Sequence, residues 1–183
     1  MKNTSYFFYF TLLVALLFAV QPAIAQEDDF INEYIERLER SKEYLILVAE
    51  TMPEEQYSYR PTVESLSFAE NLMHIGWAMD WHSQSLMGGR PARDWNTDTE
   101  LKVDKKSKAD MIAKIKETFN QTIAFIQSFD TNKLSERLDY FGANRTKRQI
   151  LLLLTDHITH HRGQMLVHLR LNGLKPPRYV LYQ

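Results

Sequence analysis

The stretch that decides the fold runs from Thr146 to Gly173 and reads TKRQILLLLTDHITHHRGQMLVHLRLNG. Thr146 and Gln149 have the pattern of a capping box, in which each side chain bonds the backbone N–H of the other residue. Asn172 and Gly173 form a helix stop signal, and two prolines follow shortly afterwards. Between these signals the apolar residues recur at helical spacing. The stretch therefore predicts one long helix.

Three further helical patterns precede it, at residues 30–52, 67–88 and 107–129. Pro53 stops the first pattern, and the second and third open on capping boxes at Ser67 and Ser107. No stretch shows the alternation of a convincing strand. Four helices of about 22 to 28 residues each predict an all-α protein whose single domain is a four-helix bundle.

The connections between the helices bear on the topology. Residues 53–66 and 89–106 are too long for tight turns between antiparallel helices, which usually take about 2 to 8 residues. We therefore expect a crossover connection over one end of the bundle, in place of simple up-down-up-down order.

Composition excludes several classes of protein. The chain has 183 residues, a net charge of −1 and no cysteine. Without cysteine there is no disulfide, thiolate metal site or cysteine nucleophile. The near-neutral charge argues against a nucleic-acid partner. With 44% apolar and 25% charged residues, the chain is typical of a folded globular protein.

The N-terminal segment is typical of a secretory signal peptide. Lys2 is followed by an apolar run from Tyr6 to Val20, and a small-residue cleavage site ends at Ala25. The run is shorter than the roughly 18 residues that a spanning helix needs, although a retained anchor is the alternative. We expect residues 1–25 to be removed and residues 26–183 to form the bundle domain. The mature protein is then exported, periplasmic or secreted, with no stable membrane insertion.

Histidines gather on the inward face of the last predicted helix. On a helical wheel His157, His161, Gln164 and His168 lie within about 40° of the apolar stripe, while Arg162 points to the opposite side. A single histidine in such a stripe is usually a hydrogen-bonded structural residue. Side chains four residues apart, however, can reach one ion, and neutral imidazole is the commonest metal-binding side chain. We therefore interpret His157 and His161 as a metal-binding pair.

A third ligand must come from another helix, and the second helix carries His74 and His82. That helix is apolar on nearly every side, so its pattern does not choose between them. The two cannot share one site, because eight residues span about 12 Å along a helix. His168 is about 10 Å past His161 and falls outside the site as well. His160 points away from the stripe and is a candidate for hydrogen bonding beside the ligands, as is Gln164.

Two other features concern the surroundings of this site. Gly163 in mid-helix costs about 1 kcal/mol relative to alanine, which predicts the close approach of another backbone. Trp77 and Trp81 are either walls of a substrate pocket or ordinary core residues at helical spacing.

Three segments of the chain resemble the DinB family. The first is HITHHRGQ at residues 157–164, followed by LRLNG at 169–173 and the two prolines at 176–177. The second is MPEEQYSYRP at 52–61, which resembles the segment between the first two helices of that family. The third is SFAENLMHI at 67–75, which resembles the start of its second helix. The resemblance covers about residues 30–178.

The resemblance implies a DinB/YfiT-like four-helix bundle with a crossover and one divalent metal held by three histidines. Carried over by position, the ligands are His74, His157 and His161. Members of the family include thiol-dependent transferases and proteins described as metal-dependent hydrolases. Export would remove this chain from the cytosolic thiol pool, so we expect a metal-dependent hydrolase or transferase acting on a small molecule not identified by the sequence.

Other interpretations stay open. All-imidazole ligation suits Zn, Ni, Fe or Cu. Asp156 lies about 100° or more off the stripe, so no evident general base accompanies the histidines. A non-catalytic, metal-stabilised or metal-binding bundle is therefore one alternative. A thiol-dependent S-transferase is a second, and an interaction protein that has lost the metal is a third. Because exposed bundle faces often pair, a homodimer is a further form that we consider.

Overall fold

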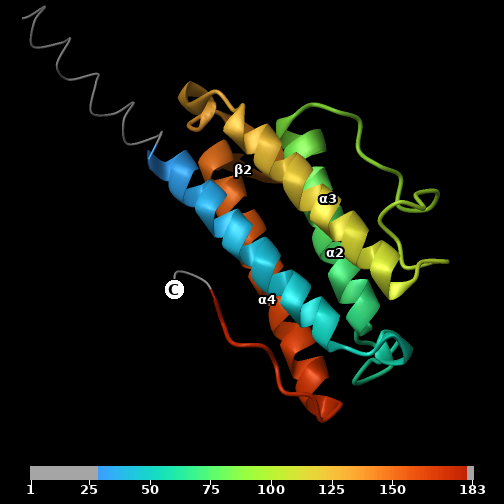
Figure 1. Cartoon of the computed structure of the whole chain (residues 1–183). Coiled ribbons are helices and arrows are strands. Elements are labelled where there is room, and N and C mark those ends of the chain that lie inside the picture. Colours follow the sequence, from blue (N-terminus) through green and yellow to red (C-terminus); the bar gives the residue numbers. More distant parts are fainter. Residues whose placement is uncertain (1–28, 181–183) are drawn as a thin grey trace, which may run out of the picture.

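The computed structural model describes residues 29–180, and the expected signal peptide lies outside them. The first helix covers residues 29–51, and the short helix η1 (Glu54–Gln56) follows it. The second long helix, α2 (Phe68–Asp80), continues into the π-helical segment η2 (Trp81–Met87). After α3 (Lys108–Gln127) come the short helix η3 (Thr131–Lys133), the strands β1 (Arg137–Tyr140) and β2 (Ala143–Thr146), and α4 (Lys147–Leu171). The predicted four-helix fold is confirmed within the described residues (Figure 1).

The helices begin where their capping boxes predict. Ser67 and Glu70 exchange both capping hydrogen bonds at the start of α2, and Thr146 and Gln149 do so at the start of α4. Ser107 begins α3 in the same way. Such caps satisfy backbone N–H groups that a helix start leaves without partners.

The crossover is also confirmed. Gly76 of α2 lies against Ile115, and seven residues further along, in η2, the hydroxyl of Ser83 lies 3.3 Å from that of Thr122. Contacts that advance together in both helices mean that α2 and α3 run parallel. The connection between them, residues 88–107, therefore returns along the length of the bundle, as Figure 1 shows.

Ion pairs hold this returning connection to α2. The buried carboxylate of Asp80 accepts hydrogen bonds from Arg90 and, at 3.1 Å, from Arg93, whose guanidinium also donates to Asp98 at 2.8 Å. Burial opposes the charged form of Asp98, but hydrogen bonds from the backbone of Leu101 and from Arg93, together with the Arg93 charge, hold the pKa of Asp98 below its usual range. The connection is thus anchored at the point where α2 becomes π-helical.

A small hairpin corrects the expectation that the chain has no strand. β1 and β2 pair antiparallel, with Arg137 opposite Thr146 and Tyr140 opposite Ala143. Phe141 and Gly142 form the turn with φ of 54° and 81°. A positive φ at both central residues is the tight hairpin turn that glycine and asparagine favour. Phenylalanine pays about 1–2 kcal/mol for this left-handed conformation, and its presence hides the turn from sequence rules.

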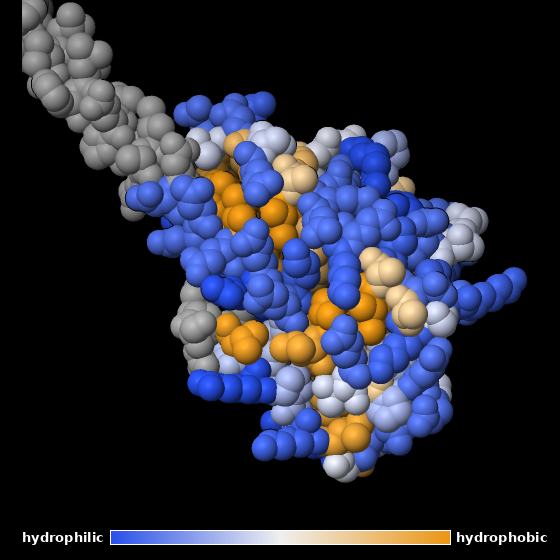
Figure 2. Space-filling model, in the orientation of Figure 1, coloured by the Kyte–Doolittle hydropathy of each residue, from blue (hydrophilic) through white to orange (hydrophobic). Residues whose placement is uncertain are grey.

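The core lies between the four helices and leaves few apolar side chains outside. Its completely buried members include Leu38, Leu45, Phe68, Ile75, Phe119, Leu154 and Met165. On the face shown in Figure 2, hydrophilic side chains dominate and apolar patches surface over the N-terminal helix and α3. None of the helices in residues 29–180 combines the length and the apolarity needed to cross a membrane.

Two predictions for α4 are wrong. Arg162 is only 2% exposed, because the first helix covers the side of α4 that the helical wheel assigns to solvent. Its guanidinium donates to the Ser41 hydroxyl at 2.7 Å and lies over the ring of Tyr44. Gly163, in contrast, is exposed, with open space where a Cβ would stand. No backbone approaches it closely, so the helix accepts this glycine without compensation from packing.

Candidate metal centre

Three histidine rings converge in the middle of the bundle. His157 and His161 are one helical turn apart on α4, and their ring centroids are 4.6 Å apart. His74, on the antiparallel helix α2, lies 5.0 Å from the first ring and 4.6 Å from the second. One nitrogen of each ring lies within 4.8 Å of the others, a spacing that brings three imidazoles within reach of one ion. Among the described residues, this is the group of side chains suited to hold a metal.

The three rings favour the neutral form that binds metals. Burial, reinforced by the neighbouring ring of His74, lowers the pKa of His157 to about 4 and that of His161 to about 3. Burial also lowers the pKa of His74. At neutral pH each ring therefore keeps a nitrogen lone pair available as a ligand.

One nitrogen at this centre has no partner. The Nε2 atom of His157 is buried and makes no hydrogen bond within residues 29–180. A buried polar atom without a partner costs about 1–3 kcal/mol, and native structures contain few of them. A metal ion would satisfy this atom, so the donor set and the desolvated Nε2 fit a divalent cation with nitrogen ligands.

Asn71 orients one of the three rings. Its Oδ1 lies 2.9 Å from the Nδ1 of His161, and its amide donates to the carbonyls of Leu66 and Ser67. Because the amide nitrogen is engaged with carbonyls, Oδ1 accepts from His161 and leaves Nε2 for a ligand role. Such partners commonly fix metal-binding histidines. Sequence analysis missed Asn71, although it lies three residues before His74 on the same helix face.

The two residues expected to support the ligands bond each other instead. The amide of Gln164 donates to the Nε2 of His160 at 2.8 Å, near the surface of α4. The ring of His160 stands perpendicular to that of His161, with centroids 5.0 Å apart. Neither residue makes a described hydrogen bond to a histidine of the centre.

His82 and His168 lie outside the converging group, as helical spacing predicts for His168 and the family resemblance implies for His82. His82 bonds the carbonyl of Ala78 at 2.6 Å and the hydroxyl of Tyr140 at 2.9 Å. His168 is buried two turns further along α4, with its ring against Tyr59 and Phe68. Both serve the packing of the bundle.

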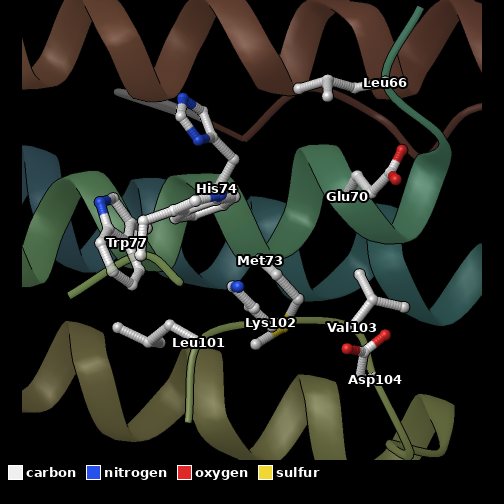
Figure 3. Close-up of a pocket in the computed structure, with 10 residues that line it drawn as sticks. Leu66, Glu70, Met73, His74, Trp77, Leu101, Lys102, Val103 and Asp104 are labelled. Atoms are coloured by element: carbon white, nitrogen blue, oxygen red, sulfur yellow. The ribbon is translucent and has the colours of Figure 1, made fainter. Parts of the chain in front are cut away.

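Two cavities open on the centre and share His74 and Trp77. The larger, about 460 Å³, lies between α2 and the returning connection. Figure 3 shows His74 and Trp77 on one side of it and Leu101 to Asp104 on the other. The second, about 370 Å³, reaches from His157 to Trp81 and the hairpin. Trp77 and Trp81 thus wall cavities beside the histidines, as one of the two interpretations predicts.

Neither Glu70 nor Asp156 is placed as a free base at the centre. Glu70 lines the larger cavity, but both of its oxygens accept from Arg60, at 2.9 and 3.0 Å, and the backbone of Ser67 also donates to it. These hydrogen bonds and the Arg60 charge outweigh burial and lower the pKa of Glu70. Asp156 is exposed on the outer side of α4. The arrangement therefore offers nitrogen ligands and no free carboxylate base among these two.

Comparison with known proteins agrees with this architecture. The model of the DinB superfamily matches residues 37–165. The chain is 27% identical over 130 residues to YjoA of Bacillus subtilis, which covers 69% of this chain and 80% of that protein. It is 38% identical to YrdA of the same organism over 58 residues, which is 30% of this chain and 35% of YrdA.

Solved structures give the same result. The crystal structure of the DinB-like protein YjoA from Bacillus subtilis matches 82% of this chain and 99% of its own, with 25% identity and a TM-score of 0.65. A DinB-like protein from Bacillus cereus matches 84% of this chain and 97% of its own, with 20% identity and a TM-score of 0.64. The second likeness is one of fold alone.

Proposed function

The chain belongs to the DinB superfamily, and on that premise we propose that it is a metal-dependent enzyme of hydrolase or transferase type. His74, His157 and His161 hold one divalent transition metal, with Zn, Ni or Fe as the candidates. The observation that carries this proposal is the convergence of three imidazoles, with one nitrogen of each within 4.8 Å of the others, and the buried Nε2 of His157, which has no hydrogen-bond partner in residues 29–180, supports it.

The residues of the centre have different roles in the proposed chemistry. Three protein ligands leave a coordination position for a small-molecule substrate or water, which is typical of catalytic sites. When bound, the metal supplies Lewis-acid chemistry, which polarises a carbonyl or lowers the pKa of water. Asn71 keeps the ring of His161 oriented, and Trp77 restricts the approach of water from the two cavities.

A second candidate function is a metal-stabilised bundle without catalysis. The pairing of Glu70 with Arg60 and the outward position of Asp156 favour it, because general acid–base catalysis needs a group free to take a proton. We also propose that residues 1–25 direct the chain to the periplasm or the medium, and N-terminal sequencing of the mature protein tests this export. A thiol-dependent transferase is less compatible with an exported protein.

Elemental analysis of the purified protein tests the metal site. We expect about one equivalent of transition metal in the wild type and almost none in His157→Ala, because two imidazoles rarely retain an ion. His168→Gln is the matched control, since it changes a buried histidine on the same helix and should retain the metal. Equal metal content in wild type and His157→Ala would refute the site.

Turnover separates the two candidate functions. Purified protein is assayed with ester, amide and thiol-acceptor substrates, with and without a chelator. Activity that disappears with the chelator and in His161→Ala supports the enzyme, whereas full metal occupancy without turnover of any class favours the metal-stabilised bundle.

A further inference from the structure

The smaller cavity beside the histidines has walls made of aromatic rings. Four rings line it, those of Trp77 and Trp81 from the second helix and those of Tyr140 and Phe141 from the hairpin, and the ring of Trp81 contacts both hairpin rings. Both His74 and His157 reach its inner end. Its volume of about 370 Å³ lies in the range of small-molecule sites. The cavity therefore leads from a hydrophobic mouth to the candidate metal centre.

Neither burial nor backbone preference favours phenylalanine at position 141. Its side chain is 81% exposed, and its backbone has a φ of 54°, a conformation that aromatic residues rarely adopt. Its ring nevertheless lies 5.3 Å from that of Trp81, tilted by only 30°. Strained backbone and exposed apolar side chains both gather at binding sites. The hairpin thus holds an aromatic ring over the mouth of the cavity.

Hydrogen bonds immobilise the wall next to it. The carbonyl of Ala78 can only accept, so the Nδ1 of His82 donates to it, and the Nε2 accepts from the hydroxyl of Tyr140. Both nitrogens of the histidine and the phenol are thereby engaged. The ring of Tyr140 is fixed beside Phe141, with centroids 4.9 Å apart and planes nearly perpendicular. A preformed wall of this kind lowers the entropy cost of binding a flat group.

The two cavities differ in charge. The larger one is lined by Glu70, Lys102 and Asp104, whereas the lining of the aromatic cavity contains no aspartate, glutamate, lysine or arginine. A charged group would lose its hydration in the aromatic cavity without gaining a partner. The ligand group that fits there is flat, apolar and uncharged.

We propose that this cavity binds an uncharged aromatic group of the substrate and directs the polar atoms attached to it toward His74 and His157. The part of the inference that concerns these polar atoms rests on the proposed metal site. The substrate class is accordingly an aromatic compound with a metal-coordinating group, and any charged portion extends into the larger cavity.

Two hydroxamates with the same chelating group test the proposal on zinc-loaded protein. By calorimetry, 2-naphthohydroxamate should bind about tenfold or more tightly than acetohydroxamate, because only the former places rings against the aromatic wall that Trp81 and Phe141 form together. In Phe141→Asn the preference should fall below about threefold. Asparagine tolerates a positive φ, so this variant keeps the turn and removes only the ring.

A control and a metal-free measurement complete the test. Asp104→Asn alters only the other cavity and should keep the preference. In metal-free protein, 2-naphthol should quench tryptophan fluorescence in the wild type but not in Phe141→Asn. Equal binding of the two hydroxamates, or a preference retained by Phe141→Asn, would overturn the aromatic site while the metal site stands. Binding of 2-naphthol to protein that takes up no zinc would refute the metal site while the aromatic site stands.

Discussion

His82 and His157 lie near each other, with ring centroids 6.5 Å apart, yet their hydrogen bonding differs completely. Both nitrogens of His82 are bonded, one to a backbone carbonyl and the other to Tyr140. The buried Nε2 of His157 has no such partner in the described part of the chain. Both rings lose contact with water, but only His82 regains hydrogen bonds within the protein that offset this cost. The comparison teaches that burial alone does not identify a ligand. A missing partner is not sufficient either, because the Nδ1 of His168 also has none; what distinguishes His157 is that its ring also converges with those of His74 and His161.

The largest effect should come from adding metal. At a free concentration of 100 times Kd, a bound ion stabilises the folded state by about 2.7 kcal/mol. For a domain of this size, this raises the melting temperature by about 5–10 °C. We expect that shift in the wild type and in His82→Gln, but none in His161→Ala. A shift lost in His82→Gln would erase the distinction between the two histidines.

Replacing Asn71 should weaken metal binding without involving a ligand. Loss of a hydrogen-bonded partner of a metal-binding histidine typically costs 10–100-fold in affinity, so Asn71→Ala should lower zinc affinity by about that factor. Ser67→Ala is the control, because it breaks the cap of the same helix and costs about 1 kcal/mol of stability. Zinc titration should separate the two variants; equal affinities would mean that Asn71 only stabilises the helix.

Acid should destabilise the metal-free protein through two histidine rings of the candidate metal centre. His157 and His161 have folded pKa values of about 4 and about 3, below the unfolded value of about 6.5. The two rings therefore contribute to the stability of the folded state above pH 6.5, and this stability is lost as the pH falls toward 4. Over that range the unfolded chain binds protons that the folded chain does not bind. Between about pH 7 and 5.5 we expect a loss of about 1 kcal/mol in the free energy of unfolding, because solvent screening at the partly exposed His157 reduces the effect.

Urea denaturation at a series of pH values measures this loss. The double variant His157→Gln/His161→Gln should show a flatter dependence, whereas His160→Gln, which changes an exposed ring on the same helix, should follow the wild type. An unchanged slope in the double variant would show that other groups cause the acid sensitivity.

The smallest expected effect on the metal centre concerns His82, the histidine whose two nitrogens are both hydrogen-bonded. Tyr140→Phe removes one hydroxyl and leaves the Nε2 of His82 without its donor, which should cost about 1–2 kcal/mol of stability. Metal content should not change. Chemical denaturation together with elemental analysis gives both quantities, and a loss of metal in this variant would place His82 in the metal site.

The fold could be predicted largely from local signals. The capping boxes at Ser67, Ser107 and Thr146 mark helix starts because they satisfy backbone groups within four residues of chain. The hairpin was not predicted because Phe141 occupies a turn position where asparagine or glycine would have indicated the turn. The burial of Arg162 was not predicted because a helical wheel assumes one buried face, whereas α4 is covered on two sides.

The site was predictable only in part, for a related reason. The spacing of His157 and His161 is local, but helical geometry alone could not choose between His74 and His82. Asn71 bonds a ring that lies 90 residues away in the chain, and the Tyr140–His82 bond spans 58 residues. Such partners depend on how the helices and the hairpin pack, which no local pattern encodes.

X-ray absorption spectroscopy of the zinc-loaded protein tests the central claim most directly. Three imidazole ligands predict Zn–N distances of about 2.0–2.1 Å and the multiple-scattering pattern of histidine rings, which should disappear with the bound zinc in His157→Ala. Zinc coordinated only by oxygen, or a spectrum unchanged in that variant, would contradict the assignment of His74, His157 and His161 as the metal centre.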